Sequence, residues 1–128
     1  MTLLITCLFI ATLFPYLAKI PVAYAMQQAG GYNNNYPREQ QAALQGFGAR
    51  ALAAHQNSFE SLLVFAIAIL TAIATNNNSN LVETLAVVHI IARVFYHVLY
   101  LMNLAMIRSL VWSIGLLSSL VILGSCMV

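Results

Sequence analysis

Hydrophobic residues fill four long runs of the chain, and shorter polar stretches separate these runs. A helix needs about 20 apolar residues to cross the hydrocarbon core of a bilayer. Each run reaches that length, at residues 3–24, 47–75, 81–102 and 107–127. The pattern therefore predicts an all-α membrane protein, in which one domain over residues 1–128 forms an up-and-down bundle of four transmembrane helices.

The polar stretches between the runs predict three connections. Residues 27–46 contain two consecutive glycines, three consecutive asparagines and a proline, so this stretch is expected to be the one long loop. Residues 76–80 predict a short turn, and residues 103–106 predict a tighter one. None of these stretches has the features of a linker to a second domain.

The first run shares one feature with a secretory signal peptide. Ala23, Tyr24 and Ala25 resemble the small-x-small pattern of a cleavage site. A signal peptide also begins with a positively charged segment, and no Lys or Arg precedes this run. We therefore expect the run to remain in the protein as the first transmembrane helix.

The composition supports a lipid-facing surface. Of the 128 residues, 62% are hydrophobic and only 6% are charged, whereas a soluble domain carries roughly 25% charged residues. The net charge of +2 includes no basic run that could neutralise a phosphate backbone. The composition argues against a soluble enzyme, a disordered tail and a nucleic-acid partner.

Cys7, Cys126 and Glu83 lie near the ends of the apolar runs, and we expect none of them to belong to a functional site. Cys7 and Cys126 match no metal-binding or redox spacing, so no metal site is expected. We interpret both cysteines as core residues, with a disulfide between them as the alternative. Glu83 lies close to the membrane surface beside the Asn-rich turn and is expected to be solvated.

The distribution of Lys and Arg predicts the orientation. Lys19, Arg38, Arg50 and Arg108 fall near the side of the long loop, whereas the side with both termini has no Lys or Arg. Cytoplasmic loops carry the excess of positive charge. The loop at residues 27–46 is therefore expected to be cytoplasmic, with both termini on the opposite side.

Two opposite charges fall deep inside the predicted membrane helices. A charge at mid-bilayer costs about 2.5–3.5 kcal/mol on insertion scales, and such residues usually mark function. Glu60 and Arg93 each lie roughly 18 Å from the start of their own helix, at depths that differ by about one helical turn. An ion pair between them is feasible, within one subunit or across a subunit boundary.

Other polar residues share the helix faces of these two charges. In the second run, an arc of about 100° contains Arg50, Asn57, Glu60 and Ser61. In the third run and at the residue that follows it, an arc of about 120° contains His89, Arg93, Tyr96, His97, Tyr100 and Asn103. The two stripes predict a polar cleft whose cytoplasmic mouth includes Arg50, Tyr100 and Arg108, whereas His55 points away from the main stripe. The alternative interpretation is that these residues only hold helices together through hydrogen bonds.

The residue types of the cleft indicate a ligand class. Arginine binds carboxylates and phosphates through paired hydrogen bonds, and a buried Glu favours an ammonium group. The cleft therefore suits a small zwitterion with more carboxylates than amines. Glutathione has that pattern, although the same charges could also hold a lipid headgroup.

Residues 50–60 resemble the signature of the MAPEG family, the membrane-associated proteins in eicosanoid and glutathione metabolism. That signature places Arg-Ala before an Asn-x-x-Glu, as at Arg50, Asn57 and Glu60 here. Residues 93–100 are similar to the family's next helix, in which an Arg is followed by Tyr after three and seven residues. The chain length and the Asn-Tyr-Pro-Arg loop at residues 35–38 resemble those of small bacterial members.

The resemblance implies a homotrimer in a bacterial inner membrane that binds glutathione as co-substrate between adjacent subunits. The residues implied to hold glutathione are Arg50, His55, Asn57, Glu60, Arg93, Tyr96 and Tyr100. Arg108 is the implied catalytic residue, because an arginine early in the fourth helix stabilises the thiolate in active members. The implied activity is that of a glutathione S-transferase or peroxidase, whose lipophilic small-molecule substrate arrives from the membrane lipid.

Two other functions are considered. The first is a non-catalytic membrane protein that binds a lipid or an anionic metabolite in the same cleft. The second is a small proton-coupled exporter with one buried acid. Such exporters place the acid in their first helix without a matching arginine, whereas here Arg93 would neutralise Glu60.

Overall fold

The computed structural model describes residues 1–127, so that Val128 of the expected domain lies outside the described residues. Four long helices and one short helix make up the fold. Their bounds are α1 (Thr2–Gln28), α2 (Pro37–Ala42), α3 (Gly46–Ala74), α4 (Asn80–Leu101) and α5 (Ala105–Ser125). The four long helices are each long and apolar enough to cross a membrane, which confirms the predicted all-α fold class with four transmembrane helices.

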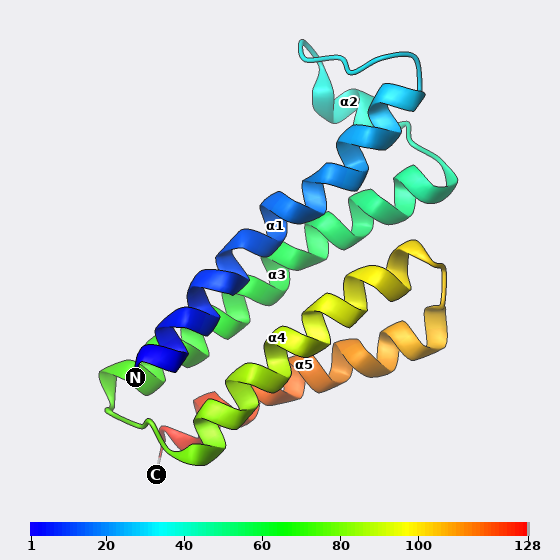
Figure 1. Ribbon diagram of the computed structural model, residues 1–128. Helices are drawn as coiled ribbons and strands as arrows, with labels where there is room; N and C mark the ends of the chain where they lie inside the picture. The colour runs from blue at the N-terminus through cyan, green and yellow to red at the C-terminus, as the bar shows by residue number, and fades with distance from the viewer. Residues whose placement is uncertain (128) are drawn as a thin grey trace.

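The long helices run up and down beside one another (Figure 1). α1 packs mainly on α3, α4 packs mainly on α5, and α3 also contacts both α4 and α5. The two termini and the α3–α4 turn lie at one end of the bundle, and the loop with α2 lies at the other (Figure 1). The predicted bundle topology is confirmed.

The turns form where the sequence supplies residues that tolerate a left-handed backbone. Asn76 after α3 has φ of 56°, and Asn103 after α4 has φ of 61°. Asparagine adopts this conformation more readily than most residues. Asn77 then ties this end of the bundle together, because its Nδ2 donates to the backbone oxygen of Ser125 at 3.1 Å.

The predicted loop contains a helix that the sequence pattern did not predict. α2 begins with Pro37, which is suited to a first helical position because its missing N–H needs no partner there. The side chain of Gln40 anchors α2 to the end of α1. Its Nε2 donates to the backbone oxygens of Met26 at 3.1 Å and Gly31 at 2.7 Å.

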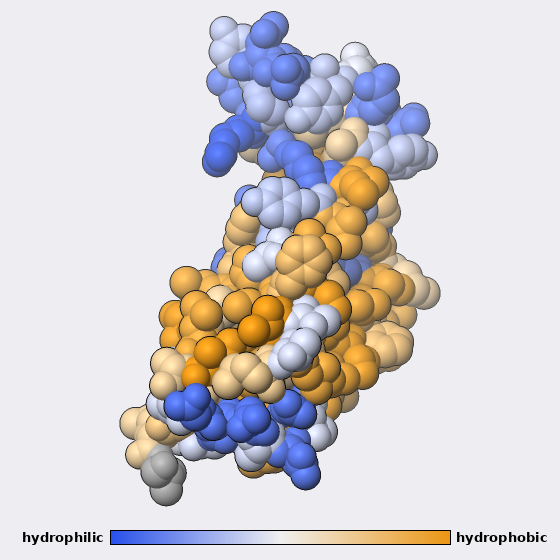
Figure 2. Space-filling model, turned by 60° about the vertical axis from the view of Figure 1, so that its left-hand side comes forward, coloured by the Kyte–Doolittle hydropathy of each residue, from blue (hydrophilic) through white to orange (hydrophobic). Residues whose placement is uncertain are grey.

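The surface of the bundle is suited to lipid. Figure 2 shows a broad hydrophobic band between two polar ends, one of them formed by the α2 region. Large apolar side chains are exposed on all four long helices, among them Phe9, Leu63, Val94 and Leu117. Since a soluble protein rarely exposes so continuous an apolar surface, the chain is an integral membrane protein.

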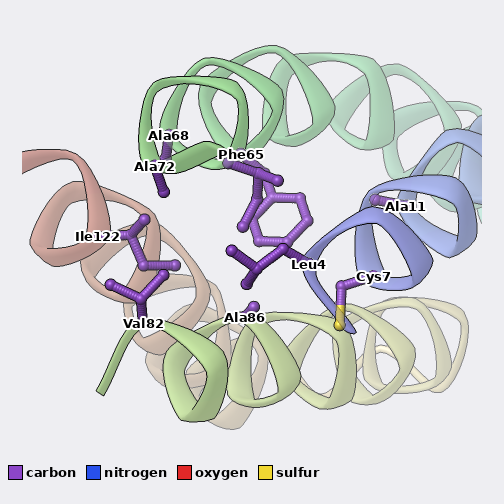
Figure 3. Close-up of a cluster of buried hydrophobic side chains, with 10 residues drawn as sticks. Leu4, Cys7, Ala11, Phe65, Ala68, Ala72, Val82, Ala86 and Ile122 are labelled. Carbon is purple, nitrogen blue, oxygen red and sulfur yellow. The ribbon is translucent and has the colours of Figure 1, made fainter. Parts of the chain in front are cut away.

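The main core lies toward the end of the bundle that carries the termini. It packs Leu4 and Cys7 of α1 against Phe65 of α3, Ala86 of α4 and, on α5, the residue Ile122 (Figure 3). Small side chains let the helices approach closely, as is typical of membrane bundles. The core interpretation of the cysteines agrees with the structure, since both are free thiols and Cys7 is buried.

The contact of Glu83 differs from the expectation that this side chain is solvated. Instead of being only solvated, its Oε1 accepts a hydrogen bond from the N-terminal amine at 3.3 Å. The pair forms because α1 begins at Thr2, at the same end of the bundle as the start of α4.

Candidate functional site

A hydrogen-bonded chain of a cation, an amide and a carboxylate crosses from α4 to α3. Nη2 of Arg93 donates to Oδ1 of Asn57 at 2.9 Å, and Nδ2 of Asn57 donates to Oε2 of Glu60 at 2.8 Å. An amide side chain can make both contacts because it carries an acceptor and two donors. Arg93 is buried, with 3% of its surface exposed, whereas Glu60 is on the exposed face of α3.

Within one chain, this arrangement replaces the direct Glu60–Arg93 ion pair that the sequence made feasible. Among the residues that the structure describes, no carboxylate forms an ion pair with Arg93. Asn57 precedes Glu60 by three residues on α3 and lies between the two charges, so the amide takes the guanidinium contact. The two charges are therefore coupled through Asn57.

Aromatic rings continue the site along α4 to α5. The Arg93 guanidinium carbon lies 4.2 Å from the centre of the Tyr96 ring, and the Tyr96 and Tyr100 ring centres are 5.5 Å apart. The Arg108 guanidinium carbon lies 4.0 Å from the centre of the Tyr100 ring. The spacing of three and four residues along α4 places Arg93, Tyr96 and Tyr100 on one face. Each cation is therefore positioned over the π-face of a tyrosine.

We call these residues the arginine site. Its members are Asn57, Glu60, Arg93, Tyr96, Tyr100 and Arg108. Two openings adjoin it: a cavity of about 100 Å³ between Glu60, Arg93 and Trp112, and a hollow of about 270 Å³ beside Tyr96, Tyr100 and Arg108. The site thus combines two guanidinium groups, one carboxylate and two phenols next to free volume.

Comparison with known proteins shows the family to which this sequence is related. The sequence model of the MAPEG family matches residues 3–128, essentially the whole chain. The chain belongs to the MAPEG family. Neither the curated proteins nor the solved structures include a match to it. The family is a four-helix membrane bundle, in agreement with the fold of this chain.

Two expected residues of this MAPEG chain lie apart from the arginine site. Nε of Arg50 donates to the backbone oxygen of Leu101 at 3.4 Å, where it meets the last carbonyls of α4. Nδ1 of His55 lies 2.8 Å from the backbone oxygen of Pro15 in α1. Because a carbonyl only accepts, this nitrogen is the donor.

His55 belongs instead to a second polar hollow, on a different side of α3. This hollow has a volume of about 440 Å³. We call it the basic hollow, and its lining includes Lys19, Arg38, Gln41, His55, Gln56 and Phe59. A single chain therefore presents a site with a carboxylate and a separate hollow with cationic side chains.

The polar stripe expected on α4 separates in the structure. His89 stacks on Phe65 with ring centres 4.0 Å apart, and its Nδ1 lies 2.9 Å from the backbone oxygen of Gly115. His97 faces α1, where its ring stacks on Phe14 at 5.9 Å. An arc of 120° on α4 is wide enough to meet three neighbouring helices. His97 therefore lies apart from the arginine site, whereas His89 faces α5 and still lines the cavity of about 100 Å³ beside Arg93.

The structure adds two positions that the sequence reasoning missed. Trp112 borders both openings of the arginine site, and Ser119 borders the smaller one. Trp112 follows Arg108 by four residues, so the helical period of α5 could have indicated it. Ser119 follows Trp112 by seven residues, so the same period places it on the same face of α5, further from the loop with α2. Within residues 1–127, no cluster of His, Cys, Asp or Glu is arranged to hold a metal ion.

Proposed function

We propose that this MAPEG protein binds glutathione in the arginine site and positions its thiol for attack on lipophilic electrophiles. The observation that carries the proposal is the Arg93–Asn57–Glu60 hydrogen-bonded chain, which holds a cation and a carboxylate at one site inside the membrane. Membership of the MAPEG family supports it. A charge pair of this kind is costly to place in lipid and is therefore a marker of function.

The ligand pattern of glutathione is complementary to these groups. Glutathione carries two carboxylates, one amine and one thiol. Arg93 presents a planar guanidinium that binds a carboxylate through two hydrogen bonds, and Glu60 attracts the ammonium group. Tyr96 and Tyr100 add hydroxyl groups and apolar rings that can cover the peptide.

Arg108 is proposed as the residue that activates the thiol. A cation beside a thiol stabilises the thiolate, which is the nucleophile. Arg108 lies in the first turn of α5, where the partial positive charge of the helix N-terminus adds to its own. The thiolate sulfur would form a bond to the electrophilic carbon and displace the leaving group. With a peroxide, the sulfur would take one oxygen atom and release an alcohol.

The exposure of Glu60 supports a site between subunits. On the outer face of α3, this carboxylate would meet lipid in a single chain, at a cost of about 2.5–3.5 kcal/mol near the bilayer centre. A neighbouring copy that covers it would remove most of that cost. We propose that the neighbour's basic hollow faces the arginine site, with Lys19, Arg38 and His55 near the second carboxylate of glutathione.

Such an interface joins two different faces of the same chain. Repeated contacts of this kind form a ring where the rotation between copies closes, and the ring proposed here is the homotrimer of the family resemblance. The positive-inside rule supports an orientation with α2 on the cytoplasmic side and both termini opposite. A bacterial inner membrane is the proposed location.

The test compares glutathione with an analogue in which a methyl group replaces the thiol. If the charges carry binding, calorimetry on the protein in nanodiscs should give similar affinities for the two compounds. Arg93→Lys should weaken both about tenfold, because a lysine keeps the charge but loses the paired hydrogen bonds. Glu39→Gln, on α2 and outside the arginine site, is the matched control and should leave both affinities unchanged.

Turnover is tested separately with chlorodinitrobenzene. Wild-type protein should form the glutathione conjugate, and the product should appear only when glutathione is present. Binding without conjugation would support the non-catalytic alternative, in which case native mass spectrometry should show a co-purified lipid or anionic metabolite. Absence of any glutathione binding would contradict the proposal.

A further inference from the structure

The hollow beside Arg108 is bounded mainly by aromatic rings. Tyr96, Tyr100 and Trp112 are three of its five lining residues, and Arg108 and Ser109 are the others. Its volume of about 270 Å³ lies just below the range for drug-sized ligands, which is about 300–1,000 Å³. The hollow therefore suits a compact ring better than a long flexible chain.

Trp112 is the ring of this hollow whose faces have no stacking partner. The Arg93 guanidinium covers one face of Tyr96, and the Arg108 guanidinium covers one face of Tyr100. The two tyrosines also meet each other edge-on. Within residues 1–127, no ring and no guanidinium stacks on the indole of Trp112. Since aromatic rings gain from offset-stacked contacts, this indole is suited to pair with the ring of a ligand.

Trp112 is open to the bilayer at a depth where an anchoring role does not explain it. Of its residue surface, 41% is exposed. It lies seven residues, or about 10 Å along the axis, from the start of α5 at Ala105. Tryptophans that anchor membrane proteins lie at the level of the lipid headgroups. At its greater depth, the exposed indole is accessible to compounds dissolved in the hydrocarbon.

Trp112 also lies next to the proposed site of thiol activation. It follows Arg108 by four residues, so the two side chains project from one face of α5 about one helical turn apart. It borders the smaller cavity as well, whose lining includes Arg93 and Glu60. A ligand ring on Trp112 would therefore lie between the lipid and the place where the thiolate is held.

We propose that this hollow binds flat aromatic compounds from the bilayer against the free indole of Trp112, and that this stacking selects aromatic electrophiles for conjugation. The selection rests on the proposed glutathione conjugation, whereas the aromatic binding does not. In the conjugation of chlorodinitrobenzene, the thiol first gives its proton to water. The thiolate sulfur then bonds to the ring carbon that carries chlorine, and chloride leaves with the bonding electron pair. Trp112 holds the ring and determines specificity.

Aromatic binding is tested without glutathione, by the fluorescence of the wild-type protein in phosphatidylcholine liposomes. Trp112 is the only tryptophan in the sequence, so the tryptophan emission comes from this ring. The probe is 1,3-dinitrobenzene, a flat quencher without a leaving group. A stacked complex should reduce the emission to saturation without shortening the fluorescence lifetime, whereas random collisions shorten the lifetime in proportion. The matched control is 1-nitrooctane, which has no ring and should quench by collision alone.

Selection is tested by the kcat/KM of conjugation for chlorodinitrobenzene and for 2-nonenal, a linear electrophile. Trp112→Leu should lower kcat/KM for chlorodinitrobenzene about three- to tenfold, the effect of one aromatic pair. It should leave the value for 2-nonenal within about twofold. Trp112→Phe keeps a flat ring and should recover most of the loss. Leu110→Ala, exposed on α5 and outside both openings, is the control and should change neither value.

The outcomes separate this inference from the proposed function. A lifetime that falls in proportion to the emission, or no quenching because lipid or a second copy covers the indole, would overturn the aromatic site. Equal losses for both electrophiles in Trp112→Leu would overturn the selection and leave the transferase intact. Saturable quenching without conjugation of either electrophile would contradict the transferase, and with it the selection, while the aromatic site would stand. If Trp112→Leu fails to fold, Trp112→Met gives the same comparison without a ring.

Discussion

Removal of the Asn57 amide should destabilise the bundle, because this side chain is the hydrogen-bond partner of the buried Arg93. In Asn57→Ala the Arg93 guanidinium loses a 2.9 Å hydrogen bond. Because only 3% of the surface of Arg93 is exposed, water cannot readily take the place of the lost amide. A hydrogen bond to a charged group contributes about 1.5–3 kcal/mol. The second bond, to Glu60, lies on the exposed face of α3 and should add little. The expected loss in the free energy of unfolding is about 2–3 kcal/mol.

The loss can be measured by titration with sodium dodecyl sulfate in mixed micelles. Trp112 is the only tryptophan in the sequence and borders the same cavity, so its fluorescence reports on this region. Ser61→Ala is the matched control, because Ser61 lines the cavity but takes no part in these hydrogen bonds. Asn57→Asp should fall between the two, since it offers Arg93 an acceptor but repels Glu60. An Asn57→Ala transition that overlays that of Ser61→Ala would refute the reasoning.

Three further predictions concern other parts of the bundle. Arg108→Gln should lower the rate of glutathione conjugation about tenfold or more, while calorimetry shows an affinity for glutathione within about threefold of wild type; a parallel fall in both would contradict a role in thiol activation. Gly48→Ala should lower the free energy of unfolding by about 1–3 kcal/mol, because its new Cβ would lie 3.1 Å from the Cβ of Ala25. Gly124→Ala places its Cβ in open space and should leave the free energy of unfolding unchanged or raise it by up to about 1 kcal/mol. Glu83→Gln removes the partner of the N-terminal amine and should cost less than about 1 kcal/mol in the same titration, because the pair is partly solvated; a larger loss would show that the pair holds α1 in place.

The fold was largely readable from the sequence because the bilayer imposes one strong constraint. A span of about 20 apolar residues has few alternatives to a helix, and asparagines at positions 76 and 103 mark where two helices end. α2 was missed because a six-residue helix has no hydrophobic period to detect. Contacts of Gln40 with backbone oxygens of α1 and the loop hold it.

The sequence predicted the depth of the arginine site in the membrane, but it predicted fewer of the contacts between its side chains. The helical rise placed Glu60 and Arg93 at similar levels, but it could not show that Asn57 would lie between them. The rotation of α4 about its own axis decides that His89 faces α5 and that His97 faces α1. That rotation depends on how all four helices pack, which the pattern of a single helix does not contain.

Both ends of the bundle are fastened by polar links, Asn77 to Ser125 at one end and Arg50 to Leu101 at the other. A compound dissolved in the lipid meets the protein from the side, along the exposed apolar faces of the long helices. Its occupancy depends on its mole fraction in the bilayer, which its partition coefficient sets. Binding constants for such compounds will be comparable between preparations only when the lipid-to-protein ratio is held fixed.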